Sequence, residues 1–118
     1  MEFDRWTVLF LLRRDDAPEL DEKAGDTLQD AHLAYLARLH GEGPFAAAGP
    51  VEGSPDPKVV GICLYRVGAH EARSLAQADP AVQAGRLRVD VLSWSVPRGA
   101  LAATAVRFPR SMADVDTA

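Results

Sequence analysis

Apolar and polar positions follow two different periods along this chain and predict four strands and two main helices. Apolar runs rich in β-branched and aromatic residues predict strands at 6–12, 45–48, 59–66 and 87–96. Apolar positions three and four residues apart predict helices at about 27–40 and 69–78, with one further turn at 80–84. The order β-α-β-β-α-β is the ferredoxin-like pattern, an α+β fold with the helices on one face of an antiparallel sheet.

Turn-forming residues set the boundaries that we expect. Asp26 or Thr27 would cap the first helix, and Gly41 would end it. We expect one domain over residues 1–97 and a C-terminal extension over residues 98–118. Within that extension, LAATAVRF is compatible with a short strand or a short helix, and the closing SMADVDTA is expected to be frayed.

Two of the predicted strands are apolar on both faces. In the first strand, Val8 and Phe10 point to one side while Leu9 and Leu11 point to the other, and residues 59–66 behave in the same way. An antiparallel sheet with one face in water should instead alternate apolar and polar positions. Because two short helices cover only one face, we expect a homodimer packed sheet to sheet. The alternative is a monomer whose residues 97–118 fold back over the second face.

Composition narrows the classes of function. The chain of 118 residues is 47% hydrophobic and 25% charged, as a folded domain is, and its net charge is −4. The basic residues are spread out, which argues against nucleic-acid binding. No apolar run approaches 18 residues, so we expect no membrane span. The opening MEFDRW does not resemble a signal peptide, and we therefore expect a cytoplasmic location.

His32 lies in the apolar stripe of the first helix, between Leu28, Leu36 and Leu39 in angular position. An imidazole turned inward needs a hydrogen-bond partner, because burying an unpaired polar group costs about 1–3 kcal/mol. Histidine also titrates near neutrality, which suits a general base at the floor of a pocket. A core histidine bonded to a carbonyl or hydroxyl group is the structural alternative.

Asp79 precedes Pro80 and invites two interpretations. An Asp-Pro pair is typical of the first positions of a helix, where the carboxylate accepts a backbone N–H. The second carboxylate oxygen could at the same time face His32 and hold its imidazole in one tautomer. One carboxylate can perform both tasks.

The remaining candidates suggest simpler roles. Tyr35 lies about one turn from His32, where it could line the same cavity or pack in the core. Cys63 is the single cysteine and suits a buried structural thiol better than a nucleophile. The histidines lack the close helical spacing of a zinc site, and no phosphate-binding loop is present. We therefore expect neither a metal nor a cofactor.

Three strings together resemble the YciI-like (YCII-related) family: AHLAYLARLHGEG, the following AAAGP, and AQADPAVQAG before the last strand. The resemblance covers roughly residues 6 to 97. It implies a dimeric α/β barrel built from ferredoxin-like subunits, with a His and an Asp paired in a pocket. By motif, the histidine of AHL is His32 and the aspartate of ADP is Asp79.

The chain departs from the family pattern at two places. Many members carry an arginine about one turn before the helical histidine, where this chain has Leu28 and Gln29. Many also have an aromatic residue after ADP, where this chain has Ala81. These departures predict a pocket that lacks a cation and make an anionic substrate less expected.

The resemblance also suggests a reaction class. Relatives include a dehydrochlorinase acting on a chlorinated hydroxyquinol and, more distantly, muconolactone isomerases. Our hypothesis is a small cofactor-independent lyase or isomerase, in which His32 transfers a proton, Asp79 orients it and Tyr35 contacts the substrate. The alternatives are a dimeric module that binds a small metabolite without turnover, and an interaction protein that contributes only its surface.

Overall fold

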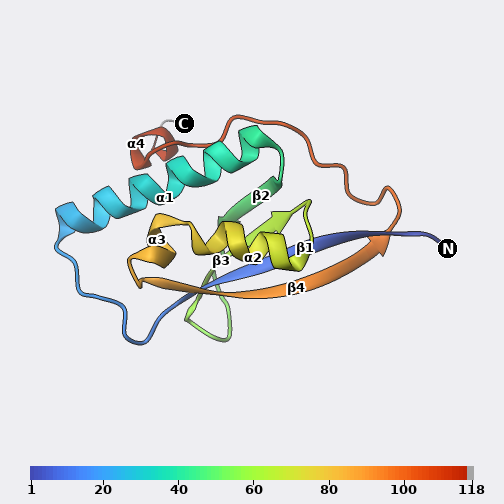
Figure 1. Ribbon diagram of the computed structural model, residues 1–118. Coiled ribbons are helices and arrows are strands. Elements are labelled where there is room, and N and C mark those ends of the chain that lie inside the picture. The colour runs from blue at the N-terminus through green and yellow to red at the C-terminus, as the bar shows by residue number, and fades with distance from the viewer. Residues whose placement is uncertain (117–118) are drawn as a thin grey trace.

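The computed structural model describes residues 1–116 and has the predicted order of elements (Figure 1). The strands are β1 (Phe3–Arg13), β2 (Phe45–Pro50), β3 (Val59–Tyr65) and β4 (Leu87–Pro97), and the helices are α1 (Glu22–Glu42), α2 (Ala69–Gln77), α3 (Pro80–Gln83) and α4 (Met112–Val115). Up to β4 the order is β-α-β-β-α-β, with α3 as the predicted extra turn. The ferredoxin-like fold expected from the apolar pattern is therefore confirmed.

The four strands form one antiparallel sheet in the order β2-β3-β1-β4. The long strand β1 lies at its centre, where Leu9 pairs with Cys63 of β3 and with Val91 of β4. These three side chains share the face that α1, α2 and α3 cover. Both neighbours of β1 thus contribute apolar residues to the same core, which explains why β1 is apolar over most of its length.

Helix α1 is longer than the sequence analysis predicted at both ends. Its cap is Asp21, whose side chain accepts a hydrogen bond from the backbone N–H of Ala24 at 2.7 Å. It ends at Gly43, which takes a left-handed φ of 108° that suits glycine. The predicted cap at Asp26 or Thr27 and the predicted stop at Gly41 are therefore wrong. The helix continues past both because Asp21 caps it five residues earlier and Gly43, two residues later, takes the left-handed conformation that ends it.

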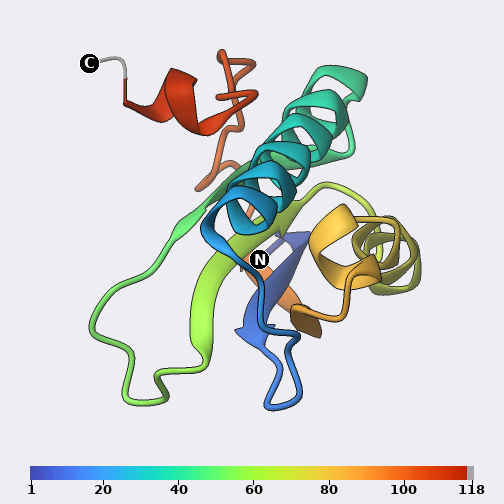
Figure 2. The same cartoon turned by 90° about the vertical axis from the view of Figure 1, so that its left-hand side faces the viewer.

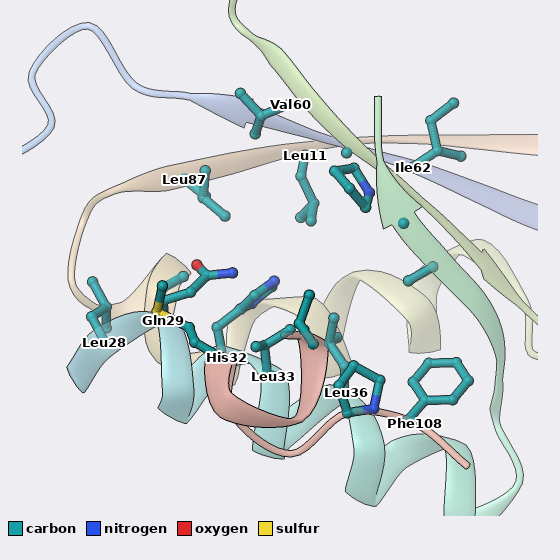
Figure 3. Close-up of a pocket in the computed structure, with 18 of the residues that line it drawn as sticks. Leu11, Leu28, Gln29, His32, Leu33, Leu36, Val60, Ile62, Leu87 and Phe108 are labelled. Atoms are coloured by element: carbon teal, nitrogen blue, oxygen red, sulfur yellow. The ribbon is translucent and has the colours of Figure 1, made fainter. Parts of the chain in front are cut away.

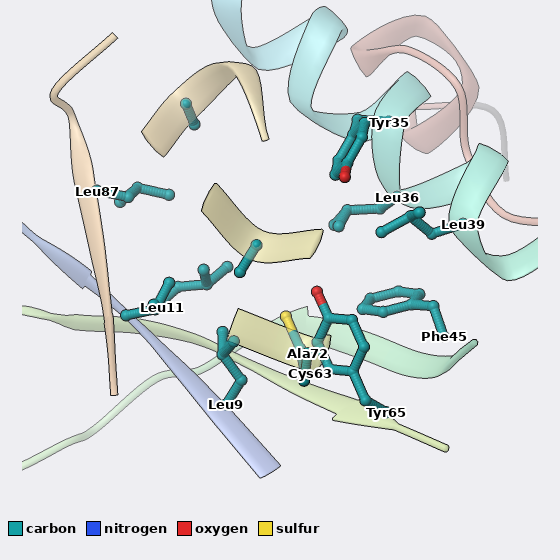
Figure 4. Packing of buried hydrophobic residues seen from close by; sticks show 13 residues of the cluster. Leu9, Leu11, Tyr35, Leu36, Leu39, Phe45, Cys63, Tyr65, Ala72 and Leu87 are labelled. Atoms are coloured by element: carbon teal, nitrogen blue, oxygen red, sulfur yellow. The ribbon is translucent and has the colours of Figure 1, made fainter. Parts of the chain in front are cut away.

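The main core lies between the helices and the sheet (Figure 4). Leu39 of α1 and Phe45 of β2 pack against Tyr65 of β3, and the rings of Phe45 and Tyr65 meet edge to face at 5.0 Å. Cys63 lies in the same cluster and is 1% exposed. Burial, together with the charge of Asp79, raises the pKa of its thiol to about 12, so Cys63 is a protonated structural residue.

The C-terminal segment (residues 98–116) wraps around the domain (Figure 1 and Figure 2). Leu101 and Ala103 pack against Trp6, Leu64 and Val96 on the face of the sheet opposite the helices, which we call the outer face. The segment then reaches α1, and Figure 2 shows it with α4 on one side of that helix, while α2 and α3 lie on the other.

The segment has little regular structure until the short helix α4, which Ser111 caps. A strand or helix at 101–108 is not present, and the predicted fraying of residues 111–116 is wrong, because α4 packs on α1. Residues 117–118, which belong to the same prediction, lie outside the described part of the chain. Within residues 1–116, no helix has the length and apolar character needed to span a membrane.

The C-terminal segment covers only part of the outer face. Ile62, Leu92 and Trp94 on that face stay 39%, 49% and 45% exposed, with the half-buried Val8 and Phe10 between them. The C-terminal extension therefore folds back over one end of the outer face, as the monomeric alternative predicted. An apolar patch remains uncovered over the rest.

Candidate functional site

A cavity of about 650 Å³ lies between α1 and the sheet. Figure 3 shows Leu28, Gln29, His32, Leu33 and Leu36 entering it from α1, facing side chains of the strands. The strand residues that line it include Leu11, Gly61 and Leu87. Most of these side chains are apolar, so the imidazole of His32 is a polar group set in an apolar wall.

His32 reaches this position because α1 places one face toward the sheet. Its buried residues are His32, Tyr35, Leu36 and Leu39, which follow the spacing of a single helical face. His32 is 7% exposed and lines the cavity. The inward orientation that the apolar stripe predicted is therefore confirmed.

Asp79 approaches His32 from the junction between α2 and α3. Its Oδ2 lies 2.7 Å from Nδ1 of His32, and the carboxylate is almost completely buried, at 2% exposure. Its Oδ1 accepts a hydrogen bond from the backbone N–H of Ala81 at 2.9 Å and so caps α3. The two interpretations of Asp79 are compatible, because one oxygen caps the helix while the other contacts the imidazole.

This geometry fixes the orientation of the imidazole. A carboxylate at 2.7 Å accepts the proton of Nδ1, and the neutral ring then carries its lone pair on Nε2. Among the residues that the structure describes, Nε2 has no hydrogen-bond partner. The arrangement can accept a proton from a bound molecule at Nε2, and the adjacent carboxylate would stabilise the resulting imidazolium.

Three arginines also line the cavity, namely Arg13, Arg86 and Arg107. Arg107 lies 3.6 Å from Asp114, whereas Arg13 and Arg86 form no ion pair with any acidic side chain in residues 1–116. The prediction that the pocket lacks a cation is therefore wrong. It considered only the helical position before His32, whereas Arg13 of β1 and Arg86, which precedes β4, line the cavity from other elements, as does the acidic Asp116.

Tyr35 occupies the core and is absent from the cavity wall. Its hydroxyl donates to the backbone carbonyl of Leu75 at 2.6 Å, and the guanidinium of Arg38 lies 5.0 Å from its ring centroid. Burial raises the pKa of this phenol above its ordinary value. Its surroundings correspond to the packing alternative, and our proposal below assigns it no contact with a ligand.

His40 lies outside the cavity, at the end of α1, and forms hydrogen bonds there. Its Nδ1 donates to the carbonyl of Phe45 at 2.9 Å, and its Nε2 accepts from the N–H of Val106 at 3.0 Å. The ring also stacks on Phe108 at 4.1 Å. Both ring nitrogens are therefore hydrogen-bonded to the backbone, which anchors the C-terminal segment to the end of α1.

Two features of the cavity escaped the sequence analysis. Gly61 stands opposite Leu11, and a Cβ placed on it would meet Cδ1 of Leu11 at 3.3 Å. A glycine inside an apolar strand often marks such a close approach, and this signal was available. The second feature is the C-terminal segment, which supplies Phe108 and Met112 to the cavity. Scattered apolar residues in a polar tail gave no periodic signal.

Comparison with known families shows to which protein family this chain belongs. Residues 8–95 match the YCII-related domain. The chain belongs to the YCII-related family. The match spans β1 to β4 and includes both His32 and Asp79, while the C-terminal segment lies beyond it. No curated protein matches this YCII-related chain.

A solved structure supports the same fold. The 5-chloro-2-hydroxyhydroquinone dehydrochlorinase TftG from Burkholderia phenoliruptrix AC1100, in complex with 2,5-dihydroxybenzoquinone, resembles this YCII-related protein with a TM-score of 0.54. The sequences are 21% identical, and the similarity covers 75% of this chain and 92% of the other. At this identity the likeness establishes a shared fold.

Proposed function

We propose that this protein is a cofactor-independent enzyme that transfers a proton on a small organic substrate, with His32 as the general base and Asp79 as the residue that orients it. The observation that carries the proposal is the 2.7 Å contact between the two side chains, which points the free Nε2 into an apolar cavity. A structural histidine needs a partner for its ring, but it does not need to line a cavity with its second nitrogen unpaired.

The chemistry that fits this pair begins with the removal of a proton, from a C–H bond or, in a chlorinated hydroxyquinol that has tautomerised to its ketone, from an O–H bond. Nε2 takes the proton, and the electron pair of that bond enters the substrate. In an isomerisation, the imidazolium returns the proton to another carbon. In an elimination, the electron pair forms a double bond and a leaving group such as chloride departs. Asp79 stabilises the imidazolium in both cases, and a base of this kind contributes about 10²–10⁴-fold to the rate.

The cavity favours a substrate with an apolar body and an acidic group. Its walls are mainly apolar, with Leu and Val the most frequent apolar residues, while Arg13 and Arg86 form no ion pair among the described residues. A phenolate, enolate or carboxylate would interact favourably with these guanidinium groups. The structural likeness to a dehydrochlorinase that binds a dihydroxybenzoquinone supports this class of ligand for the proposal.

The same proposal includes a homodimer formed through the outer face. Ile62, Leu92 and Trp94 form an exposed apolar patch on a strand face that the C-terminal segment leaves open. A second copy presents the same patch, so a two-fold contact would bury both patches together. The resemblance of the fold to dimeric α/β-barrel proteins supports a second copy as the occupant.

The specific alternative is a dimeric module that binds a small metabolite without turnover. The observation in its favour is that few polar side chains line the cavity. His32 and Gln29 are the uncharged ones. Turnover separates this alternative from an enzyme, because both require the same ligand-binding cavity.

The test uses the wild-type protein with chlorinated hydroxyquinols and with lactones. Under argon, to prevent oxidation of the quinols, we expect saturable release of chloride or isomerisation of a lactone above the rate without protein. Isomerisation in D₂O should incorporate deuterium at the carbon that accepts the proton. Ligands that perturb the NMR signals of His32 without being converted would instead favour the binding module.

A further inference from the structure

We infer that residues 106–116 of the C-terminal segment form the specificity-determining wall of the His32 cavity, with Phe108 and Met112 setting the size of the apolar body that it accepts. The inference rests on the proposed ligand-binding role of this cavity. It concerns a part of the chain that the match to the YCII-related domain, which ends at residue 95, does not include.

The segment closes a side of the cavity that the domain itself leaves open. Residues from Val106 to Asp116 contribute to its lining. Figure 3 shows Phe108 and Leu28 toward opposite ends of the cavity, and His32 lies between them. A ligand in contact with Nε2 of His32 would therefore extend toward Phe108 in one direction, where the C-terminal segment limits its length.

Specific contacts hold the segment against α1. At one end of the helix, Nε2 of His40 accepts the N–H of Val106, and the ring of Phe108 stacks on that imidazole and meets Phe45 edge to face at 5.8 Å. Nearer the start of the helix, Oδ1 of Asp30 accepts the N–H of Met112 at 2.8 Å. These two sets of contacts, at separate points along α1, fix the position of the C-terminal segment beside the cavity.

The apolar side chains of the segment are unusually exposed for their type. Val106, Met112 and Val115 are 58%, 38% and 59% exposed, although all three line the cavity. Exposed apolar side chains that border one cavity are typical of a ligand-binding surface. A bound apolar ligand would cover them, so they act as contact surface for a ligand and add little to the folded core.

The test measures binding of a graded series of 4-alkylbenzoates, from methyl to hexyl, by the NMR signals of His32. The carboxylate suits the arginines, and the alkyl chain probes length. Met112→Ala and Phe108→Ala should raise the affinity for the hexyl compound relative to the methyl compound by about tenfold or more, and Met112→Phe should lower that ratio. General destabilisation would not shift the ratio of the two affinities in opposite directions when the side chain at position 112 is made smaller or larger.

Leu101→Ala is the matched control. Leu101 belongs to the same segment but packs on the outer face beside Trp6, away from the cavity. We expect it to leave the ratio unchanged. Equal ratios in wild type and in all three variants at Phe108 and Met112 would overturn the specificity role alone. If no member of the series perturbs His32 in the wild type, both this inference and the proposed ligand site fail.

The attachment at Asp30 gives an independent readout. Asp30→Ala removes the acceptor for the N–H of Met112, whereas Asp30→Asn keeps an oxygen that can accept it. We expect the alanine variant to relax the preference for short chains and the asparagine variant to retain it. A preference that survives in the alanine variant would show that the segment does not set the size limit through this contact.

Discussion

Replacing His32 with Asn should reduce turnover by about 10²–10⁴-fold on any substrate that the wild type converts. The side-chain amide of Asn places an N–H near the position of Nδ1 and can still donate to Asp79, but it offers no nitrogen that corresponds to Nε2. The buried carboxylate, at 2% exposure, therefore keeps a partner while the base is lost. Initial rates at saturating and limiting substrate measure the effect.

The choice of Asn over Ala separates catalysis from folding. His32→Ala would leave the carboxylate of Asp79 with only the N–H of Ala81, which costs about 1–3 kcal/mol of stability. His70→Ala removes an exposed histidine on α2 and should leave the rate unchanged. Wild-type turnover in a folded His32→Asn variant would refute the role of general base.

Introducing a carboxylate at the centre of the outer face should convert a dimer into a monomer. Trp94→Glu places a charge within the patch formed with Leu92 and Ile62, and two-fold symmetry would bring that charge into the contact twice. Burying an unpaired charge costs several kcal/mol, so the dissociation constant should rise roughly 100-fold or more. Light scattering at micromolar concentration should show twice the mass of one chain for wild type and that of one chain for the variant.

Leu20→Glu provides the control for this experiment. Leu20 is 38% exposed in the loop before α1, outside the sheet, and the same change there should leave the mass unchanged. Circular dichroism should confirm that both variants are folded. A wild-type protein that has the mass of one chain over the whole accessible concentration range would contradict the proposed dimer.

The apolar pattern was sufficient to predict the sheet and the helices that cover it. Residues such as Leu9 and Cys63 pair across neighbouring strands as their alternation implied. The ends of α1 were less predictable, because Asp21 and Asp26 are both chemically suited to cap a helix. Only the packing of the first helical turn, together with the N–H of Ala24, distinguishes them.

The sequence was sufficient to predict those features of the site that depend on the local pattern around a single residue. The apolar stripe oriented His32 inward, and the Asp-Pro pair placed Asp79 at a helix start, but their distance depends on how α1 packs against α3. The arginines and the C-terminal segment reach the cavity from distant parts of the chain. Their contribution is a property of the tertiary structure, which neither local periodicity nor a motif around His32 encodes.

The most direct test of the central claim is the tautomer of the neutral His32 ring, measured by long-range ¹H–¹⁵N correlation. The account predicts a proton on Nδ1, donated to Asp79, and a free lone pair on Nε2. Asp79→Asn should shift the proton toward Nε2, because the amide can donate to Nδ1 while its oxygen still accepts from Ala81. The account would be contradicted by a wild-type ring protonated on Nε2, or by a tautomer that is the same in the wild type and in Asp79→Asn.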